Sequence, residues 1–177
     1  MHRLFVAIRP PESVRESLLD LMEGIADARW VDEDQLHLTL RFIGEVDRHG
    51  AEDVAAALAS VRHPAFEIAV GGLGSFDRRS GAATLWAGVT PHEALRALHK
   101  KVDQALQRTG LEPERRAYHP HITLARLPRG AGSIQALLDR AGPIVTPPFA
   151  VREFILFESR LTPKGPIYTE AATYSLA

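Results

Sequence analysis

The chain has 177 residues, enough for one domain with a hydrophobic core or for two small lobes that share one. Its 21 Lys and Arg residues nearly balance its 22 Asp and Glu residues, and the formal net charge of −1 argues against a broad basic surface that would hold long nucleic-acid duplexes. Cysteine is absent, which excludes disulfides, thiolate nucleophiles and Cys-ligated metals.

Hydrophobic periodicity divides the chain into short strands and helices. Runs with apolar and polar residues in alternation, or rich in β-branched and aromatic residues, predict strands. Apolar residues at helical spacing predict helices between these runs. The predicted strands lie at 4–8, 35–43, 66–70, 84–89, 121–125, 149–157 and 167–174, and the predicted helices at 14–25, 54–61, 91–106 and 134–138.

Two local signals refine the middle of the chain. The glycine-rich segment 71–81 predicts a bulge and a hairpin between two strands. Thr90, Pro91 and Glu93 have the pattern of a capped helix start, with the threonine as N-cap.

The order of elements is similar in the two halves of the chain, which indicates an approximate internal duplication. We therefore predict an α+β fold with two antiparallel-rich sheets that face each other and with helices packed outside. No linker is long enough to separate two independent domains, so residues 1–177 are expected to form a single two-lobed domain.

One tetrad, His-apolar-Thr-Leu, occurs once in each half, as HLTL at 37–40 and as HITL at 121–124. Side chains alternate along a strand, so the histidine and the threonine of each tetrad share one face and the two apolar residues share the other. If the halves are related by pseudo-symmetry, both imidazole–hydroxyl pairs face one cleft.

A pair of imidazoles suits phosphoryl chemistry because histidine titrates near neutral pH. One ring can accept a proton as general base while the other donates one as general acid. The hydroxyls of Thr39 and Thr123 can donate to the non-bridging oxygens of a phosphate. A strained cyclic phosphodiester would need no metal.

Two other interpretations compete with this one. The two histidines can be unrelated buried or edge residues. Alternatively, His119 and His121 can form a His-x-His metal site, although a catalytic zinc site normally has three protein ligands and neither tetrad contains an acidic residue.

Three longer strings carry a family resemblance: HLTLRFIGEV at 37–46, YHPHITLARL at 118–127 and FESRLTPKGPIYTE at 157–170. They resemble the bacterial branch of the two-histidine phosphoesterase superfamily, the RNA 2',3'-cyclic phosphodiesterases that are also called 2'-5' RNA ligases. The resemblance covers nearly the whole chain and neither tetrad departs from it. It implies a bilobal fold with a central cleft, hydrolysis of RNA or nucleoside 2',3'-cyclic phosphates to 2'-phosphates, and a weak, reversible 2'-5' joining of RNA ends.

The resemblance also implies the site residues. His37 corresponds to the general acid and His121 to the general base, with Thr39, Thr123 and Arg126 as phosphate contacts and Phe42 packed on the nucleobase. No metal and no cofactor are implied.

Phe42 and Arg126 raise a geometric difficulty, because each lies five residues after its histidine and strict alternation would turn both toward the core. We predict that both strands bulge or twist near their ends. A core position remains the alternative for Phe42. His119 is placed at the cleft rim, whereas His2, His49, His63, His92 and His99 are interpreted as surface or helix-flanking residues.

The expected partners are RNA ends or nucleotides with a 2',3'-cyclic phosphate. No apolar run approaches the roughly 18 residues of a membrane span, and the N-terminus has no signal-peptide pattern, so a cytoplasmic protein without membrane contact is expected. No obligate protein partner is evident, and we expect a monomer. The alternatives are the same site acting on another cyclic phosphate or on a 2'-5' oligonucleotide, or a non-catalytic module that binds RNA ends.

Overall fold

Strands dominate the backbone of the computed structural model, which describes residues 1–177. In chain order the elements are β1 (His2–Ile8), α1 (Glu12–Leu19), β2 (Arg29–Trp30), the 3-10 helix η1 (Glu33–Gln35), β3 (Leu38–Val46), α2 (Arg48–Leu58), β4 (Phe66–Asp77), β5 (Ala83–Thr90), α3 (Glu93–Gln107), β6 (His121–Leu127), α4 (Gln135–Ala141), β7 (Phe149–Val151), β8 (Glu153–Thr162) and β9 (Gly165–Ser175).

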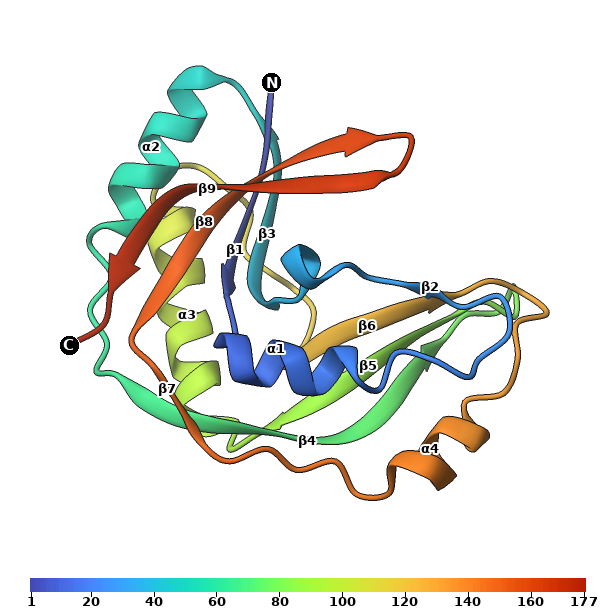
Figure 1. Ribbon diagram of the computed structural model, residues 1–177. Coiled ribbons are helices and arrows are strands. Elements are labelled where there is room, and N and C mark those ends of the chain that lie inside the picture. The colour runs from blue at the N-terminus through green and yellow to red at the C-terminus, as the bar shows by residue number, and fades with distance from the viewer.

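All strands belong to one curled antiparallel sheet with the order β7-β4-β5-β6-β3-β1-β8-β9, and β2 pairs with β6. Figure 1 shows that the strands diverge into two arms. We call β1, β3, β8 and β9 the first lobe, and β2, β4, β5, β6 and β7 the second lobe. Between β3 and β6, the register pairs Leu38 with Ile122, so the halves join at the residues that directly follow the two histidines.

The α+β class with two antiparallel-rich halves is confirmed, and the two expected sheets are joined edge to edge. Helices α2 and α3 lie beside the first lobe, whereas α1 and α4 lie along the second (Figure 1). One core cluster of 31 buried residues includes apolar side chains from both lobes. Because burial of such side chains drives folding, this shared core fixes the lobes relative to each other.

The last part of the chain crosses from one lobe to the other. The strand predicted at 149–157 is interrupted at Arg152. Before this residue β7 pairs with β4 of the second lobe, and after it β8 pairs with β1 of the first lobe. The crossing ties the C-terminal hairpin to the N-terminal strand.

Three local predictions were wrong. Helix α1 ends at Leu19 instead of continuing to residue 25, and the strand β2 and the helix η1 follow where no element was expected. Thr90 does not cap α3, because it is the last residue of β5 and pairs with Ala69; the N-cap position is His92. Competing strand pairing therefore overrode the local capping pattern.

An ion pair anchors the loop that leads to the second histidine. Arg41 Nε lies 2.7 Å from Asp103 Oδ1, and both side chains are nearly inaccessible to solvent. Asp103 also accepts from the backbone amide of Glu114, and Arg41 donates to the carbonyl of Glu112. The 108–120 loop is thus held between α3 and β3.

Replacing Asp103 with alanine would leave the guanidinium of Arg41 buried without its counter-charge. We expect Asp103→Ala to lower the free energy of unfolding by about 3–5 kcal/mol. Glu52→Ala is the matched control, because it breaks the exposed Arg48–Glu52 pair and should cost less than about 0.5 kcal/mol. Urea unfolding of both variants measures the difference, and equal losses would contradict a structural role for the buried pair.

Candidate active site

The two imidazoles are held in the same way. Nδ1 of His37 donates to the carbonyl of Gln35, and Nδ1 of His121 donates to the carbonyl of His119, each at 2.6 Å. A carbonyl only accepts, so each ring carries its hydrogen on Nδ1 and keeps Nε2 available for chemistry. Nε2 of His37 bonds to the hydroxyl of Thr39 at 3.0 Å.

Strand β3, which begins directly after His37, and strand β6, which begins at His121, each have a β-bulge at the leucine of the tetrad. In β3 the register passes from Thr39 to Arg41 and leaves Leu40 without a partner on β1. In β6 the register passes from Thr123 to Ala125 and leaves Leu124 without a partner on β5. The extra residue at each point shifts the alternation by one position, so residues five positions after the histidines lie on the cleft face.

This geometry resolves the difficulty with Phe42 and Arg126. Both line the cleft, and Phe42 is 63% exposed, so it is not a core residue. The predicted bulges are confirmed. Thr39 and Thr123 also line the cleft, and His119 lies at its edge with its ring centroid 6.2 Å from that of His121. The structure brings every proposed site residue to one cleft.

Side chains stabilise the bulge of the first lobe. The hydroxyl of Tyr118 donates to the carbonyl of Thr39 at 2.9 Å, and Nδ1 of His99 donates to the carbonyl of Leu40 at 2.7 Å. The two rings stack with centroids 4.2 Å apart. In the second lobe the carbonyl of Leu124 accepts instead from the backbone amide of Val31, next to β2.

The interpretation of His99 as a surface residue was therefore wrong, since its ring is packed and hydrogen-bonded at the bulge. His63 is also buried, and its Nδ1 donates to the carbonyl of Pro64. The residues next to His99 and His63 in the sequence do not distinguish these packed histidines from exposed ones.

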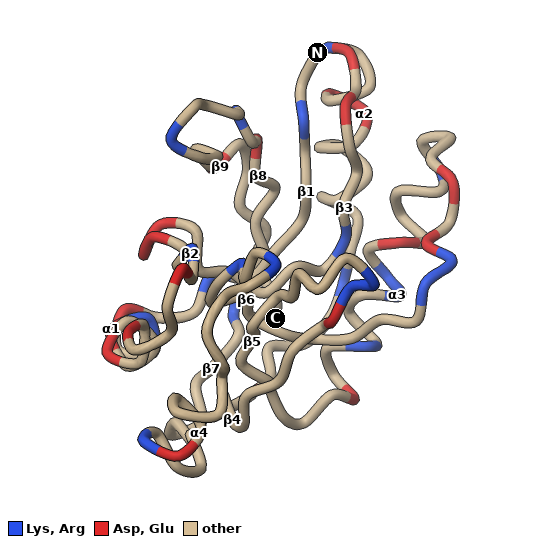
Figure 2. The backbone as a smooth tube through the Cα atoms, turned by 90° about the vertical axis from the view of Figure 1, so that its right-hand side faces the viewer, with Lys and Arg blue, Asp and Glu red and all other residues tan.

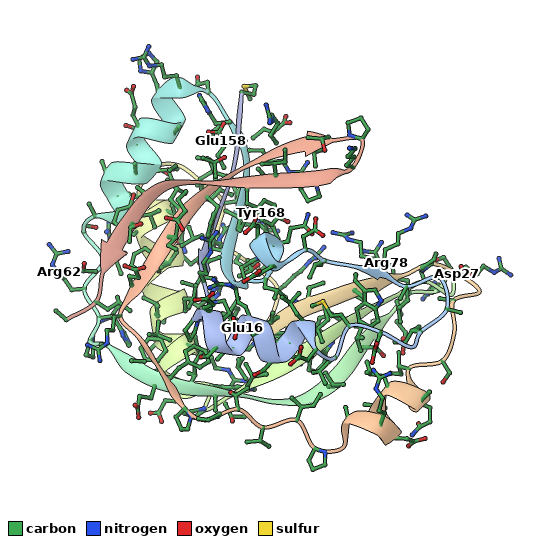
Figure 3. All side chains as sticks on the ribbon, viewed as in Figure 1. Glu16, Asp27, Arg62, Arg78, Glu158 and Tyr168 are labelled. Carbon is green, nitrogen blue, oxygen red and sulfur yellow. The ribbon has the colours of Figure 1, made fainter.

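Aromatic rings surround His37. The ring of Phe5 lies 5.0 Å from it and that of Tyr168 lies 5.4 Å away, edge-on. Figure 3 shows Tyr168 between the β8–β9 hairpin and η1. Burial lowers the pKa of His37 to about 4. The hydrogen bond to the carbonyl of Gln35 opposes this effect, while the positive charges of His121 and Arg9 lower the pKa further.

His121 has its own aromatic surroundings, formed by Phe76 and Trp86 of the neighbouring strands at 4.9 and 6.2 Å and by His119. Burial lowers the pKa of His121, and the charge of His119 adds to this effect, while the bond to the carbonyl of His119 opposes it. Both catalytic candidates are thus biased toward the neutral form in the unliganded protein.

The cleft has a volume of about 1490 Å³. Its cationic side chains outnumber its acidic ones although the whole chain carries a net charge of −1. Figure 2 shows basic positions on β1, on β3 and at the tip of the β8–β9 hairpin. A concave surface with such an excess attracts anions such as phosphates. The cations are Arg3, Arg29, Arg41, Arg116, Arg126 and Lys164, and the acids are Asp32, Glu45 and Glu114.

Sequence reasoning missed three cleft residues, Phe5, Phe76 and Tyr168. Phe5 belongs to a small apolar cluster with Ala7, Ile155 and Phe157 on the cleft side of the first lobe, separate from the main core. Burial raises the pKa of Tyr168, while the charges of Arg126 and Arg3 oppose this. Phe5 could have been found from the sequence, because β1 is apolar on both faces and one of these faces had to pack outside the main core.

No group of three or more His, Asp or Glu side chains is arranged to hold a metal ion. None of the helices is both long enough and apolar enough to span a bilayer.

The family profile described as the 2'-5' RNA ligase superfamily matches residues 10–162. The chain belongs to this superfamily. It is 38% identical over 142 residues to an RNA 2',3'-cyclic phosphodiesterase of Aeropyrum pernix, covering 78% of this chain and 80% of that one. It is 34% identical to one of Thermotoga maritima, covering 94% and 91%.

Solved structures of the superfamily agree with the fold. The crystal structure of LigT from Escherichia coli in its apo form superposes with a TM-score of 0.83 at 29% identity, and covers 99% of this chain and 98% of that one. The same protein has been crystallised with 3'-AMP, and that structure superposes with a TM-score of 0.78. LigT therefore binds a nucleotide.

Removing the Tyr118 hydroxyl tests the dependence of the site on the β3 bulge. Tyr118→Phe keeps the stack on His99 but leaves the carbonyl of Thr39 without its donor, which should cost about 1–2 kcal/mol of stability. Because Thr39 and Phe42 then lose their fixed positions, we expect kcat/KM on 2',3'-cyclic AMP to fall about tenfold.

Tyr174→Phe is the matched control, since it removes a similar bond to the carbonyl of Ala55, away from the cleft. It should lose comparable stability and keep its kcat/KM. Equal kcat/KM values for the two variants would show that catalysis does not depend on the bulge.

Proposed function

We propose that this member of the superfamily hydrolyses 2',3'-cyclic phosphates at RNA ends and on nucleosides, and that it releases 2'-phosphates without a metal or another cofactor. The observation that carries the proposal is the matched pair of imidazoles, both fixed through Nδ1 and both in one cationic cleft. The names of the relatives give the substrate class.

The bulge in β3 supports the roles of His37 as general acid and His121 as general base, because it places Phe42 in the cleft. A nucleobase packed on Phe42 brings the ribose toward His37, since Phe42 and Phe5 lie 5.9 Å apart and Phe5 contacts the His37 ring. His121 then faces the opposite side of phosphorus. An in-line displacement needs one group at each of these two positions.

The reaction then has one proton transfer on each side. His121 takes a proton from water as the water oxygen attacks phosphorus, and the bond from phosphorus to O3' breaks as His37 gives a proton to O3'. Arg126 and the hydroxyls of Thr39 and Thr123 hold the non-bridging oxygens, where charge accumulates. The lowered pKa of His37 keeps this ring neutral in the free protein, so the proton that it gives to O3' is taken up when the negative phosphate binds.

All of these groups come from one chain, which supports a monomer as the acting unit. We place this activity in the cytoplasm. Its substrates there are RNA ends or free nucleotides. The name of the superfamily also raises a second reaction, the 2'-5' joining of RNA ends, in which a 5'-hydroxyl replaces water.

Phosphorus NMR of the product tests the proposal directly. Incubation with 2',3'-cyclic AMP in the presence of EDTA should give 2'-AMP as the dominant product, because His37 protonates O3'. A dominant 3'-AMP signal would exchange the roles of the two histidines, and a reaction that stops in EDTA and resumes with zinc or manganese would favour a metal site.

Each histidine should be needed separately. His37→Ala and His121→Ala should each lower kcat by about a hundredfold or more, the usual contribution of one general acid or base. His49→Ala, which removes an imidazole that is 91% exposed on α2, is the control and should keep full activity. Near-normal turnover in either folded cleft variant would refute the two-histidine mechanism.

The pH dependence should be displaced toward acid in the free enzyme. The pKa values of both histidines lie below the ordinary 6.5, and that of His37 lies at about 4. The form in which the two histidines share one proton is therefore most populated in the pH range between about 4 and 6.5. We expect kcat/KM to follow a bell in this range. Bound phosphate stabilises imidazolium and raises both pKa values, so the kcat bell should lie at higher pH. A kcat/KM that climbs steadily to pH 10 would contradict the need for a protonated histidine.

A further inference from the structure

An exposed aromatic ring lies beside the second histidine. Phe76, near the end of β4, is 37% exposed and lines the cleft. Its ring is edge-on to His121 at 4.9 Å and edge-on to His119 at 5.3 Å. Packing against His121 accounts for the buried part of this ring, but hydrolysis gives no reason for its exposed part, because a water molecule at His121 needs no exposed apolar surface next to it.

Trp86 fixes the position of this ring. Its indole lies directly over Gly74, where a Cβ atom would approach the ring to 2.4 Å. The space over β4 next to Phe76 is therefore filled, and the two rings lie 5.2 Å apart. Phe76 packs beside this indole and keeps part of its ring exposed in the cleft.

The two lobes thus present an aromatic surface on each side of the histidine pair. On the first lobe Phe42 is 63% exposed and reaches His37 through Phe5. On the second lobe Phe76 contacts His121 itself. Exposed aromatic rings in a cationic cleft are suited to stacking of nucleobases, which tolerates different bases.

We propose that Phe76 and His119 form a second nucleoside subsite, which holds the nucleoside whose 5'-oxygen occupies the position of water beside His121. The inference rests on the proposed function, since it uses the same histidine pair and the same cyclic phosphate. It assigns the two sides of the cleft to the two RNA ends: the cyclic-phosphate end packs on Phe42, and the 5'-hydroxyl end stacks on Phe76.

The chemistry balances in both directions. In joining, the 5'-oxygen attacks phosphorus, His121 takes its proton, the bond to O3' breaks and His37 protonates O3', which leaves a 2'-5' phosphodiester. In the reverse reaction O3' attacks phosphorus, His37 takes its proton, the bond to O5' breaks and His121 protonates O5'. The reverse products are a 2',3'-cyclic phosphate and a free 5'-hydroxyl.

The reverse reaction provides the test. Adenylyl-(2'→5')-adenosine contains the second nucleoside, whereas 2',3'-cyclic AMP does not. Phe76→Leu should lower kcat/KM for the dinucleotide about tenfold more than it lowers kcat/KM for cyclic AMP, a factor within the range of base–aromatic stacking. Phe76→Tyr keeps an aromatic ring and should restore the wild-type ratio.

Phe42→Leu is the matched control on the other side of the cleft, and it should lower both rates by the same factor because both substrates place a base there. Equal losses in Phe76→Leu would mean that the ring only supports His121, and no loss on the dinucleotide would mean that no base stacks there. Either result overturns the subsite. The subsite is also overturned if wild-type enzyme in excess opens cyclic AMP but leaves the dinucleotide intact. If the enzyme fails to open cyclic AMP itself, the proposed function is refuted.

Discussion

The active site depends on two β-bulges at equivalent positions, Leu40 in β3 and Leu124 in β6. Without them, the residue five positions after each histidine would point into the core. With them, Phe42 and Arg126 join the imidazoles on the cleft face while both leucines remain buried. A bulge leaves ladder carbonyls without partners, and a buried carbonyl without a donor is costly. The side chains that satisfy them are therefore part of the site.

The two lobes solve this problem differently. The second lobe closes its bulge with a backbone amide, that of Val31 beside β2. The first lobe uses the side chains of Tyr118 and His99, which come from the loop and the helix between β5 and β6. That loop is itself anchored through Arg41 and Asp103. The segment that leads to His121 thereby also shapes the surroundings of His37. The two histidines are thus coupled through this segment as well as through the pairing of β3 with β6.

Burial and charge act against each other in the cleft. Aromatic rings around both histidines disfavour the imidazolium form, and the pKa of His37 falls to about 4. The excess of cations over acidic side chains in the cleft favours an anion. A bound phosphate restores the balance because its negative charge stabilises a protonated imidazole at the site of reaction. In the proposed mechanism, the protonation that acid–base catalysis requires thus arises in the complex with substrate.

The sequence by itself determined the histidine pair, the threonines beside them and the antiparallel α+β framework, because the His-x-Thr-Leu tetrads and the strand periodicity are local patterns. It also predicted a bulge or twist, since the family resemblance placed Phe42 and Arg126 in a cleft that strict alternation would not let them reach. Only the tertiary structure decided where the bulges lie, which groups satisfy their carbonyls and that Phe42 is exposed. It alone brought Phe5, Phe76 and Tyr168 to the histidines, and it ended α1 at Leu19. These features depend on contacts between strands far apart in the chain, and neither residue spacing nor helix and strand propensity encodes such contacts.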